Sequence, residues 1–122
     1  MAYNIQTGRS GEDAAVAYLI EKGYKIIERN YRNRIGEIDI IAIDVPYDIL
    51  VFLEIKSRRN KKYGYAFEAV NYHKQRKIIN TSMMYVALNK LIDIQMRYDI
   101  IEVYFLDKEW RISHIKNAFD GG

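Results

Sequence analysis

Two strongly apolar segments, joined by a short turn, dominate the stretch GEIDIIAIDVPYDILVFLEIKSRR at residues 36–59. Their nearly continuous Ile, Val, Leu and Phe content is typical of central strands that are covered on both faces of a sheet. Yet Asp39, Glu54 and Lys56 lie within these same segments. Because an unpaired charge buried in an apolar core costs several kcal/mol, these side chains must pair, bind a cation or change their protonation.

Strand alternation decides which face these charges occupy, since residues two apart point to the same side. Asp39 then shares a face with Ile41, while Glu54 and Lys56 share a face with Phe52. Two carboxylates on neighbouring strands can hold one hard divalent cation such as Mg²⁺, which takes one or two carboxylates together with water and phosphate oxygens. A lysine on the same face can orient a water or stabilise charge on a phosphate. The spacing therefore indicates a phosphodiesterase site.

A buried salt bridge explains the same residues without a metal. In that case Glu54 and Lys56 would neutralise each other. Asp39 would pair with Arg34 or Arg97. Ion-pair networks perturb titratable groups in the way that functional sites do, so the strand pattern leaves both interpretations open.

The remaining pattern predicts one α/β domain. A chain of 122 residues has the length of a single domain with one hydrophobic core. Helical spacing and strand-like apolar runs predict helices over 7–24 and 72–90, and strands over 24–29, 37–44, 49–57, 97–106 and 110–115. This order predicts a mixed central β-sheet of about five strands flanked by helices.

Other polar residues allow two interpretations each. Glu12 lies on the inward face of the first predicted helix, but an acid in a first turn also suits the helix dipole. Gln75 shares a helical face with Ile78, where it can bind a catalytic carboxylate, a water or a strand-end carbonyl. His73 and His114 have no second ligand at metal spacing, so we interpret both as structural or surface residues.

The composition excludes several classes of protein. The chain has no cysteine, which rules out disulfides, thiolate metal sites and a cysteine nucleophile. No apolar run reaches the roughly 18 residues of a membrane span, and the first residues lack the apolar core of a signal peptide, so we expect a cytoplasmic protein without membrane contact. A formal net charge of +3 is compatible with nucleic-acid binding but does not identify it.

Basic and aromatic residues are interleaved in three stretches, at residues 29–34, 58–65 and 72–77. Cations attract phosphates and rings stack on exposed bases, so three such stretches around the acidic strands favour nucleic-acid binding over ordinary solvated loops. The candidate contacts are Arg9, Arg32, Arg34, Arg58, Arg59, Lys61, Lys62, Tyr63 and Lys74.

The chain resembles the YraN-like family of uncharacterised bacterial proteins over nearly its whole length. The resemblance rests on GEDAAVAYLIEKGYKIIERNYRNRIGEIDIIAID, LVFLEIKSR, AVNYHKQRKI, YDIIEV and HIKNAF, in this order. It implies membership of the PD-(D/E)xK nuclease superfamily, with a restriction-endonuclease-like core and a layout similar to archaeal Holliday-junction resolvases.

The resemblance also implies roles for particular residues. The implied ligands of Mg²⁺ or Mn²⁺ are Glu12, Asp39 and Glu54, and the implied catalytic set is Asp39, Glu54, Lys56 and Gln75. The residue before Asp39 is Ile38, where the superfamily motif has proline.

The expected function is that of a metal-dependent endonuclease hydrolysing phosphodiester bonds in DNA, branched DNA included, in repair, recombination or DNA processing. Two alternatives come from other classes of protein. One is a non-catalytic nucleic-acid-binding module that retains the nuclease fold, and the other is a protein-interaction domain with a salt-bridged core. The sequence leaves open a homodimer and a protein partner in DNA processing.

Overall fold

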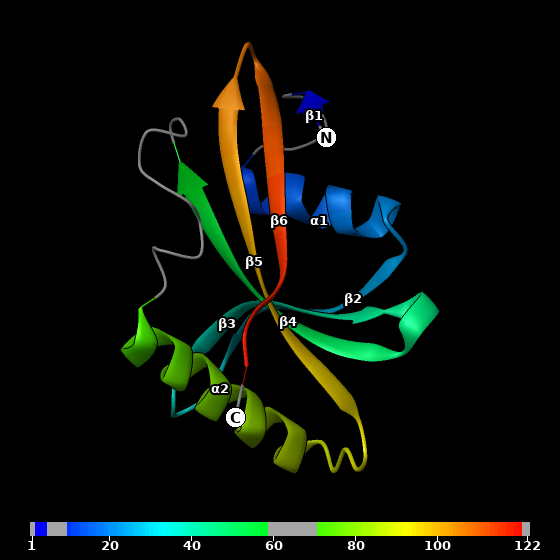
Figure 1. The fold of residues 1–122 in the computed structure, drawn as a ribbon, viewed down its shortest axis with the longest axis vertical. Helices are drawn as coiled ribbons and strands as arrows, with labels where there is room; N and C mark the ends of the chain where they lie inside the picture. Colours follow the sequence, from blue (N-terminus) through cyan, green and yellow to red (C-terminus); the bar gives the residue numbers. More distant parts are fainter. Residues whose placement is uncertain (1, 5–9, 59–70, 121–122) are drawn as a thin grey trace.

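The structure, a computed structural model, describes residues 2–4, 10–58 and 71–120. In these residues the elements are helices α1 (Gly11–Glu21) and α2 (Tyr72–Leu88), a 3-10 turn (Val45–Tyr47), and strands β1 (Ala2–Asn4), β2 (Tyr24–Arg32), β3 (Glu37–Asp44), β4 (Ile49–Arg58), β5 (Gln95–Leu106) and β6 (Glu109–Phe119). The strands form one six-stranded sheet in the order β1-β6-β5-β4-β3-β2 (Figure 1). Neighbouring strands are antiparallel except β4 and β5, which are parallel. The predicted α/β class, with a mixed sheet flanked by helices, is confirmed.

Strand β1 is the element of the described chain that the sequence pattern did not predict. Its three residues pair antiparallel with the beginning of β6, where Tyr3 lies opposite Trp110. Three residues are too few to show an alternating pattern, so nothing in this segment alone indicates a strand. The sheet therefore has one strand more than the predicted count of about five. An edge strand this small is stable only when it pairs with a neighbouring strand.

Local sequence signals set the ends of α1. The Ser10 side chain accepts a hydrogen bond from the backbone N–H of Asp13 at 3.2 Å, as an N-cap serine does. After the helix, Gly23 has a φ of 96°, which glycine adopts without steric cost. The helix is shorter than the predicted range 7–24, because it begins after the Ser10 cap and ends before Gly23. Among the described residues, neither helix is long and apolar enough to span a membrane.

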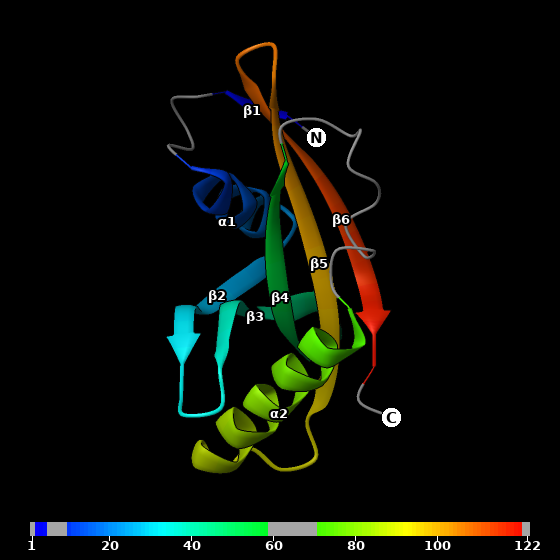
Figure 2. The same ribbon diagram turned by 90° about the vertical axis from the view of Figure 1, so that its left-hand side faces the viewer.

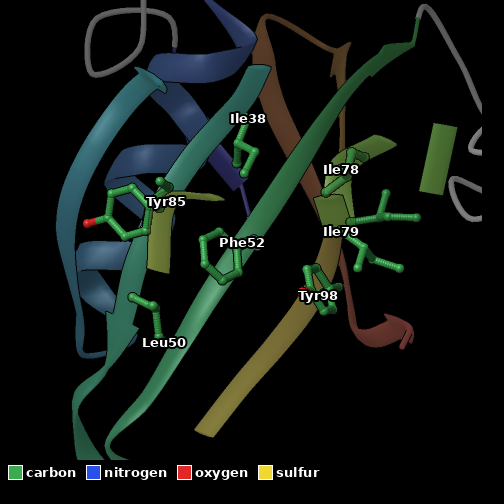
Figure 3. Close-up of a cluster of buried hydrophobic side chains, with 9 residues drawn as sticks. Ile38, Leu50, Phe52, Ile78, Ile79, Tyr85 and Tyr98 are labelled. Carbon is green, nitrogen blue, oxygen red and sulfur yellow. The ribbon is translucent and has the colours of Figure 1, made fainter. Parts of the chain in front are cut away.

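The two helices cover opposite faces of the central strands, as the continuous apolar sequence of β3 and β4 predicts. The α2 side buries Ile38, Ile41, Leu50, Phe52, Ile78, Ile79, Tyr85, Tyr98 and Ile100. The α1 side buries Ala15, Leu19, Tyr24, Ile40, Ala42, Val51, Leu53, Ile101 and Val103. Figure 3 shows the α2 side, where the ring of Phe52 stacks on that of Tyr98 with centroids 5.6 Å apart.

The sheet divides between β3 and β4, and this division positions the charged residues. The last pair that the two strands form is Ile40 opposite Leu53. Beyond it, β3 continues against β2 and β4 continues against β5. Figure 2 shows the two arms diverging. Asp39 and Glu54 are the next residues on each strand, so both stand where the strands begin to separate.

A second charged cluster is buried near the opposite end of β3. Arg97 donates to both carboxylate oxygens of Asp99 at 2.9 Å and to Asp44 at 3.0 Å. Asp99 also forms a hydrogen bond of 2.7 Å with Nε2 of His114. These contacts supply partners for acids that had none in the sequence pattern. Because Arg97 is engaged with Asp44 and Asp99, the alternative in which it neutralises Asp39 is wrong.

Candidate active site

Asp39 and Glu54, the two acids predicted to share a metal, stand at the divergence of β3 and β4. The Oδ2 atom of Asp39 accepts the backbone N–H of Ile55 at 2.7 Å. This bond satisfies an amide that points toward β3 beyond the last strand pair. The Glu54 side chain is only 9% exposed, so its ionised form needs cationic neighbours.

Two lysines converge on a single oxygen of Glu54. The Nζ atom of Lys74 lies 2.7 Å from Oε1, and that of Lys56 lies 3.3 Å from it. Lys56 follows Glu54 by two residues along β4, so both project from the same face. Lys74 comes from the first turn of α2, where its backbone N–H is bound by the Asn71 side chain at 2.9 Å. The expected pair of Glu54 and Lys56 is present, but Lys74, predicted only as a nucleic-acid contact, is the nearer cation.

Burial and the crowding of like charges shift the pKa values in this cluster. Burial, followed by repulsion from Glu54, raises the pKa of Asp39 from 3.8 to about 6. Burial lowers the pKa of Lys56, and the neighbouring Lys74 lowers it further. Burial also acts to lower the pKa of Lys74, but hydrogen bonds to Glu54 and Lys56 outweigh it and raise that pKa. A bound cation would relieve the repulsion between the two carboxylates.

Glu12, the third predicted metal ligand, faces this cluster from α1 and is held by other partners. Its Oε2 atom accepts hydrogen bonds from Arg29 at 2.7 Å and from the Asn30 amide at 3.3 Å. Its charge contributes to the raised pKa of Asp39, so the two carboxylates interact across the site. Arg29 and Asn30 both contact the same oxygen, Oε2, and the role of Glu12 as a metal ligand stays a prediction.

The donor set suits a hard divalent cation. In the part of the chain that the structure describes, no three His, Cys, Asp or Glu side chains are grouped so that they could hold a metal by themselves. Mg²⁺ does not require such a group, because it is usually bound by one or two carboxylates with waters and substrate phosphates. Asp39 and Glu54 supply that pair, and Lys74 already places a positive charge 2.7 Å from Glu54.

Gln75, the remaining predicted catalytic residue, follows Lys74 in α2 and is half-buried. Its backbone N–H donates to the Asn71 carbonyl at 2.9 Å, as part of the first helical turn. The helix therefore holds Gln75 next to the lysine that contacts Glu54. The catalytic role of its amide stays a prediction.

A groove of about 530 Å³ lies between the β2–β3 turn and the N-terminal half of α2. The cationic and imidazole side chains that line this basic groove are Arg32, Arg34, His73, Lys74 and Lys77. The first turn of α2 has no acidic residue, so the partial positive charge of the helix N-terminus adds to these cations. In Figure 1 the β2–β3 turn passes behind α2. Lys74 belongs both to the basic groove and to the Glu54 cluster, which makes the two regions continuous.

Three predicted nucleic-acid contacts meet in the basic groove, namely Arg32, Arg34 and Lys74. Lys77 and His73 also line it but were not predicted, although both lie within the basic stretch 72–77. The spacing of three residues between Lys74 and Lys77 places both on one face of a helix, and this was the available signal. Outside the described residues lie Arg9, Arg59, Lys61, Lys62, Tyr63 and the side chain of Arg58.

Gly36 allows the β2–β3 turn to approach α2 closely. A Cβ atom at this position would lie 2.8 Å from Oγ1 of Thr81 and 3.3 Å from Cε of Lys77. Thr81 is fully buried, and its hydroxyl donates to the Lys77 carbonyl at 2.7 Å, so it has little room to move. We expect Gly36→Ala to lower the free energy of unfolding by about 1–3 kcal/mol, as overpacked sites do, measured by denaturant unfolding.

A double-mutant cycle with Thr81→Ala tests whether crowding is the cause, because that substitution removes the obstructing Oγ1 atom. In the Thr81→Ala background, the substitution at Gly36 should cost clearly less than in the wild type. An equal cost in both backgrounds would show that the close approach to Thr81 is not the reason.

A family model described as "Uncharacterised protein family UPF0102" matches residues 11–103. The chain belongs to this family. It is the YraN-like family that the sequence resembles. The match begins with α1 and ends within β5, so it spans the carboxylate cluster and the basic groove of this UPF0102 protein.

UPF0102 proteins from several bacteria resemble the chain over almost their full length. The UPF0102 protein of Clostridioides difficile is 50% identical over 116 residues, which cover 95% of this chain and 98% of the relative. That of Syntrophus aciditrophicus is 46% identical over 120 residues, covering 98% of this chain and 93% of the relative. Among solved structures, a repair endonuclease from Pyrococcus abyssi is similar with a TM-score of 0.42 and 22% identity, and the match covers 80% of this chain and 38% of that one.

Proposed function

We propose that this UPF0102 protein is a metal-dependent endonuclease that hydrolyses phosphodiester bonds in DNA. The observation that carries the proposal is the convergence of Lys56 and Lys74 on Glu54, beside Asp39, with Lys74 also lining the basic groove. Paired carboxylates, amines that can reach a phosphate and a cationic surface for the backbone are the components that phosphodiester hydrolysis uses.

Asp39 and Glu54 are the proposed ligands of Mg²⁺ or Mn²⁺, with Glu12 as a third. When bound, such an ion supplies a water of lowered pKa and stabilises negative charge on the phosphate. The amide of Ile55 fixes the orientation of Asp39 through a bond of 2.7 Å, so this carboxylate needs little reordering on binding.

The two lysines are proposed to act on the substrate. Lys56 projects from rigid strand β4 on the face of Glu54, which suits it to orient the attacking water. Lys74 contacts Glu54 and also lines the basic groove, which suits it to hold an oxygen of the scissile phosphate and stabilise its developing charge. The water and the phosphate would thus meet beside the two carboxylates.

The basic groove is proposed to hold the DNA backbone. Arg34→Gln combined with Lys77→Gln removes two exposed cations from it and leaves Lys74 on Glu54. We expect DNA affinity to fall about tenfold or more at low salt, and the slope of log affinity against log salt to weaken by about two, since each lost phosphate contact releases one counterion fewer. Fluorescence anisotropy at a series of salt concentrations measures both quantities.

The matched control for this variant is Lys25→Gln combined with Lys108→Gln. These lysines are also exposed, and neither lines the basic groove. Their removal changes the net charge equally and should leave the salt slope nearly unchanged. Equal losses in the two double variants would mean that net charge, and not the groove, attracts DNA.

A cleavage assay on linear duplex, single strand, flap and four-way junction tests the proposed function. Each substrate is incubated with Mg²⁺, Mn²⁺ or EDTA, beside an Asp39→Ala/Glu54→Ala double variant. Metal-dependent cutting that the double variant loses would support the nuclease and identify the DNA structure that it prefers. Absence of cutting on every substrate with either metal would reject the function for the isolated protein.

A non-catalytic nucleic-acid-binding module is the second candidate, and one observation favours it. Cations of the protein itself already neutralise Glu54 and Glu12, with Lys74 and Arg29 each at 2.7 Å. In that case DNA binding is salt-sensitive and no metal produces cleavage. Both candidates predict that DNA binds, so a binding measurement does not separate them. The cleavage assay does.

A further inference from the structure

A second pocket, of about 430 Å³, lies near the end of β3 that is remote from Asp39. We call it the tyrosine pocket, and the residues that line it include Tyr18, Lys22, Tyr24, Asp44, Tyr47 and Lys116. None of its lining residues belongs to the basic groove. Asp44 is about 17 Å from Asp39 along β3, at the rise of an extended strand. The tyrosine pocket is therefore separate from the carboxylate cluster.

Two residues that line the tyrosine pocket, Tyr24 and Asp44, belong to a network of buried charges that the proposed cleavage does not use. Arg97 donates to Asp44 at 3.0 Å, to Asp99 at 2.9 Å and to the Tyr24 hydroxyl at 2.6 Å. Asp44 and Asp99 are 3% and 0% exposed. A buried network of this kind carries a desolvation cost, and a fully bonded one holds its members rigidly. Here the rigid network holds a tyrosine hydroxyl at the pocket.

The hydroxyl groups of Tyr24 and Tyr18 are both hydrogen-bonded to members of this network or to its neighbour His114. Because the Tyr24 hydroxyl accepts from Arg97, its own hydrogen can donate to a ligand. The Tyr18 hydroxyl lies 2.8 Å from Nδ1 of His114, whose Nε2 atom lies 2.7 Å from Asp99. Burial raises the pKa of Tyr24 to about 12 and raises that of Tyr18 as well, so both hydroxyls keep their protons at neutral pH.

The charges around the tyrosine pocket favour an anion. Lys22 follows α1 and Lys116 comes from β6, and both lysines are exposed where they line the pocket. Together with Arg97 they make three cations against two carboxylates, and both carboxylates are paired with Arg97. A negatively charged ligand would therefore meet ammonium groups and a hydroxyl donor. The ring of Tyr47, which is 68% exposed, adds an aromatic wall.

We propose that the tyrosine pocket binds the phosphate of a nucleotide, with Lys22, Lys116 and the Tyr24 hydroxyl around the phosphate and the Tyr47 ring against the base. Ammonium and hydroxyl groups form strong hydrogen bonds to phosphate oxygens, and aromatic rings stack on any base. The pocket volume falls within the range of about 300–1,000 Å³ that small ligands occupy. The phosphate belongs either to a free mononucleotide or to the end of a nucleic-acid strand. This inference does not depend on the proposed cleavage.

Calorimetric titration of the full chain with adenosine 5′-monophosphate tests the first source of phosphate. The second source is tested with a short single-stranded oligonucleotide, compared with and without a 5′-phosphate. We expect at least one of these phosphates to bind, and Lys22→Gln combined with Lys116→Gln to weaken that binding about tenfold or more. Tyr24→Phe keeps the ring and should weaken it by a smaller factor of about three to ten, the effect of one lost hydrogen bond.

Lys25→Gln combined with Lys108→Gln is again the control, because it removes two exposed lysines that do not line the pocket. If the mononucleotide binds and only the pocket variants weaken this binding, the ligand is a free nucleotide. Dependence on the 5′-phosphate of the oligonucleotide, weakened in the same variants, supports a strand end. The proposal is overturned if neither phosphate binds, or if the Lys22 and Lys116 double variant binds as tightly as the control. Circular dichroism confirms that each variant is folded.

Discussion

With glutamine in place of Glu54, metal-dependent DNA cleavage is expected to fall by about 10³-fold or more while DNA affinity stays near that of the wild type. The substitution keeps the shape of the side chain and removes the charge that Lys74 and Lys56 contact at 2.7 and 3.3 Å. These lysines are 44% and 19% exposed, so they can turn toward water and the fold should survive. Initial cleavage rates with Mg²⁺, beside binding measured by anisotropy, check this result.

Glu109→Gln is the matched control for this experiment. Glu109 also pairs with a cation, Arg111 at 3.2 Å, but it lies at the start of β6 and lines neither the groove nor the carboxylate cluster. The Glu109→Gln variant should cleave DNA at the wild-type rate. Lys56→Ala is a second test, expected to lose cleavage and retain binding. If Glu54→Gln cuts DNA as fast as the control, Glu54 has no catalytic role.

Asp99→Asn is expected to cause the largest loss of stability among single substitutions outside the candidate active site. Asp99 is 0% exposed and accepts bonds from Arg97, His114 and the backbone N–H of Asn117. An amide cannot replace both carboxylate oxygens as acceptors, and it leaves the charge of Arg97 with Asp44 alone. We expect the free energy of unfolding to fall by about 3–5 kcal/mol, measured from the denaturation midpoint at an unchanged slope.

The same variant should also change how stability depends on pH. Burial alone would raise the pKa of Asp99, but hydrogen bonds from His114 and Arg97 outweigh it and hold that pKa below its ordinary value of 3.8. A carboxyl with a lowered folded-state pKa stabilises the protein above its unfolded-state pKa, and this contribution is lost as the pH falls through the folded-state pKa. The stability difference between wild type and Asp99→Asn should therefore shrink below about pH 4.

Asp93→Asn serves as the control for both measurements. Asp93 is exposed and has a φ of 55°, a conformation that asparagine also tolerates. We expect its stability to stay within about 0.5 kcal/mol of the wild type at neutral pH. A loss as large in Asp93→Asn as in Asp99→Asn would contradict the importance of the buried network.

Much of the fold was predictable, because it depends on residues near one another in sequence. The hairpin of β3 and β4 follows from two apolar runs around a proline-containing turn. A short turn sets the register of an antiparallel pair, so Asp39 and Glu54 could be placed on neighbouring strands. The start of α1 was equally local, since Ser10 caps the helix within its own first turn.

The candidate site was predictable only in part. The acids and Lys56 could be found from strand alternation, but Lys74 reaches Glu54 from a helix that lies beyond the end of β4. No rule of sequence spacing connects residues 20 positions apart in different elements; α2 must first pack on the sheet. The packing of the strands also decides the partners of Arg97. The sequence allowed a pair with Asp39, whereas in the fold Arg97 pairs with Asp99.

Periodicity and capping are local properties, so the order of the residues was enough to show that charged residues enter the central strands, which faces they share and where helices begin. Which cation each carboxylate meets depends instead on how the helices and strands pack together. Glu54 pairs with Lys74 because α2 packs across its face, and Asp44 pairs with Arg97 because β5 enters the sheet beside β4. An ion pair forms only where two charged groups come within about 4 Å, and the distances between these elements are set by the packing of the core.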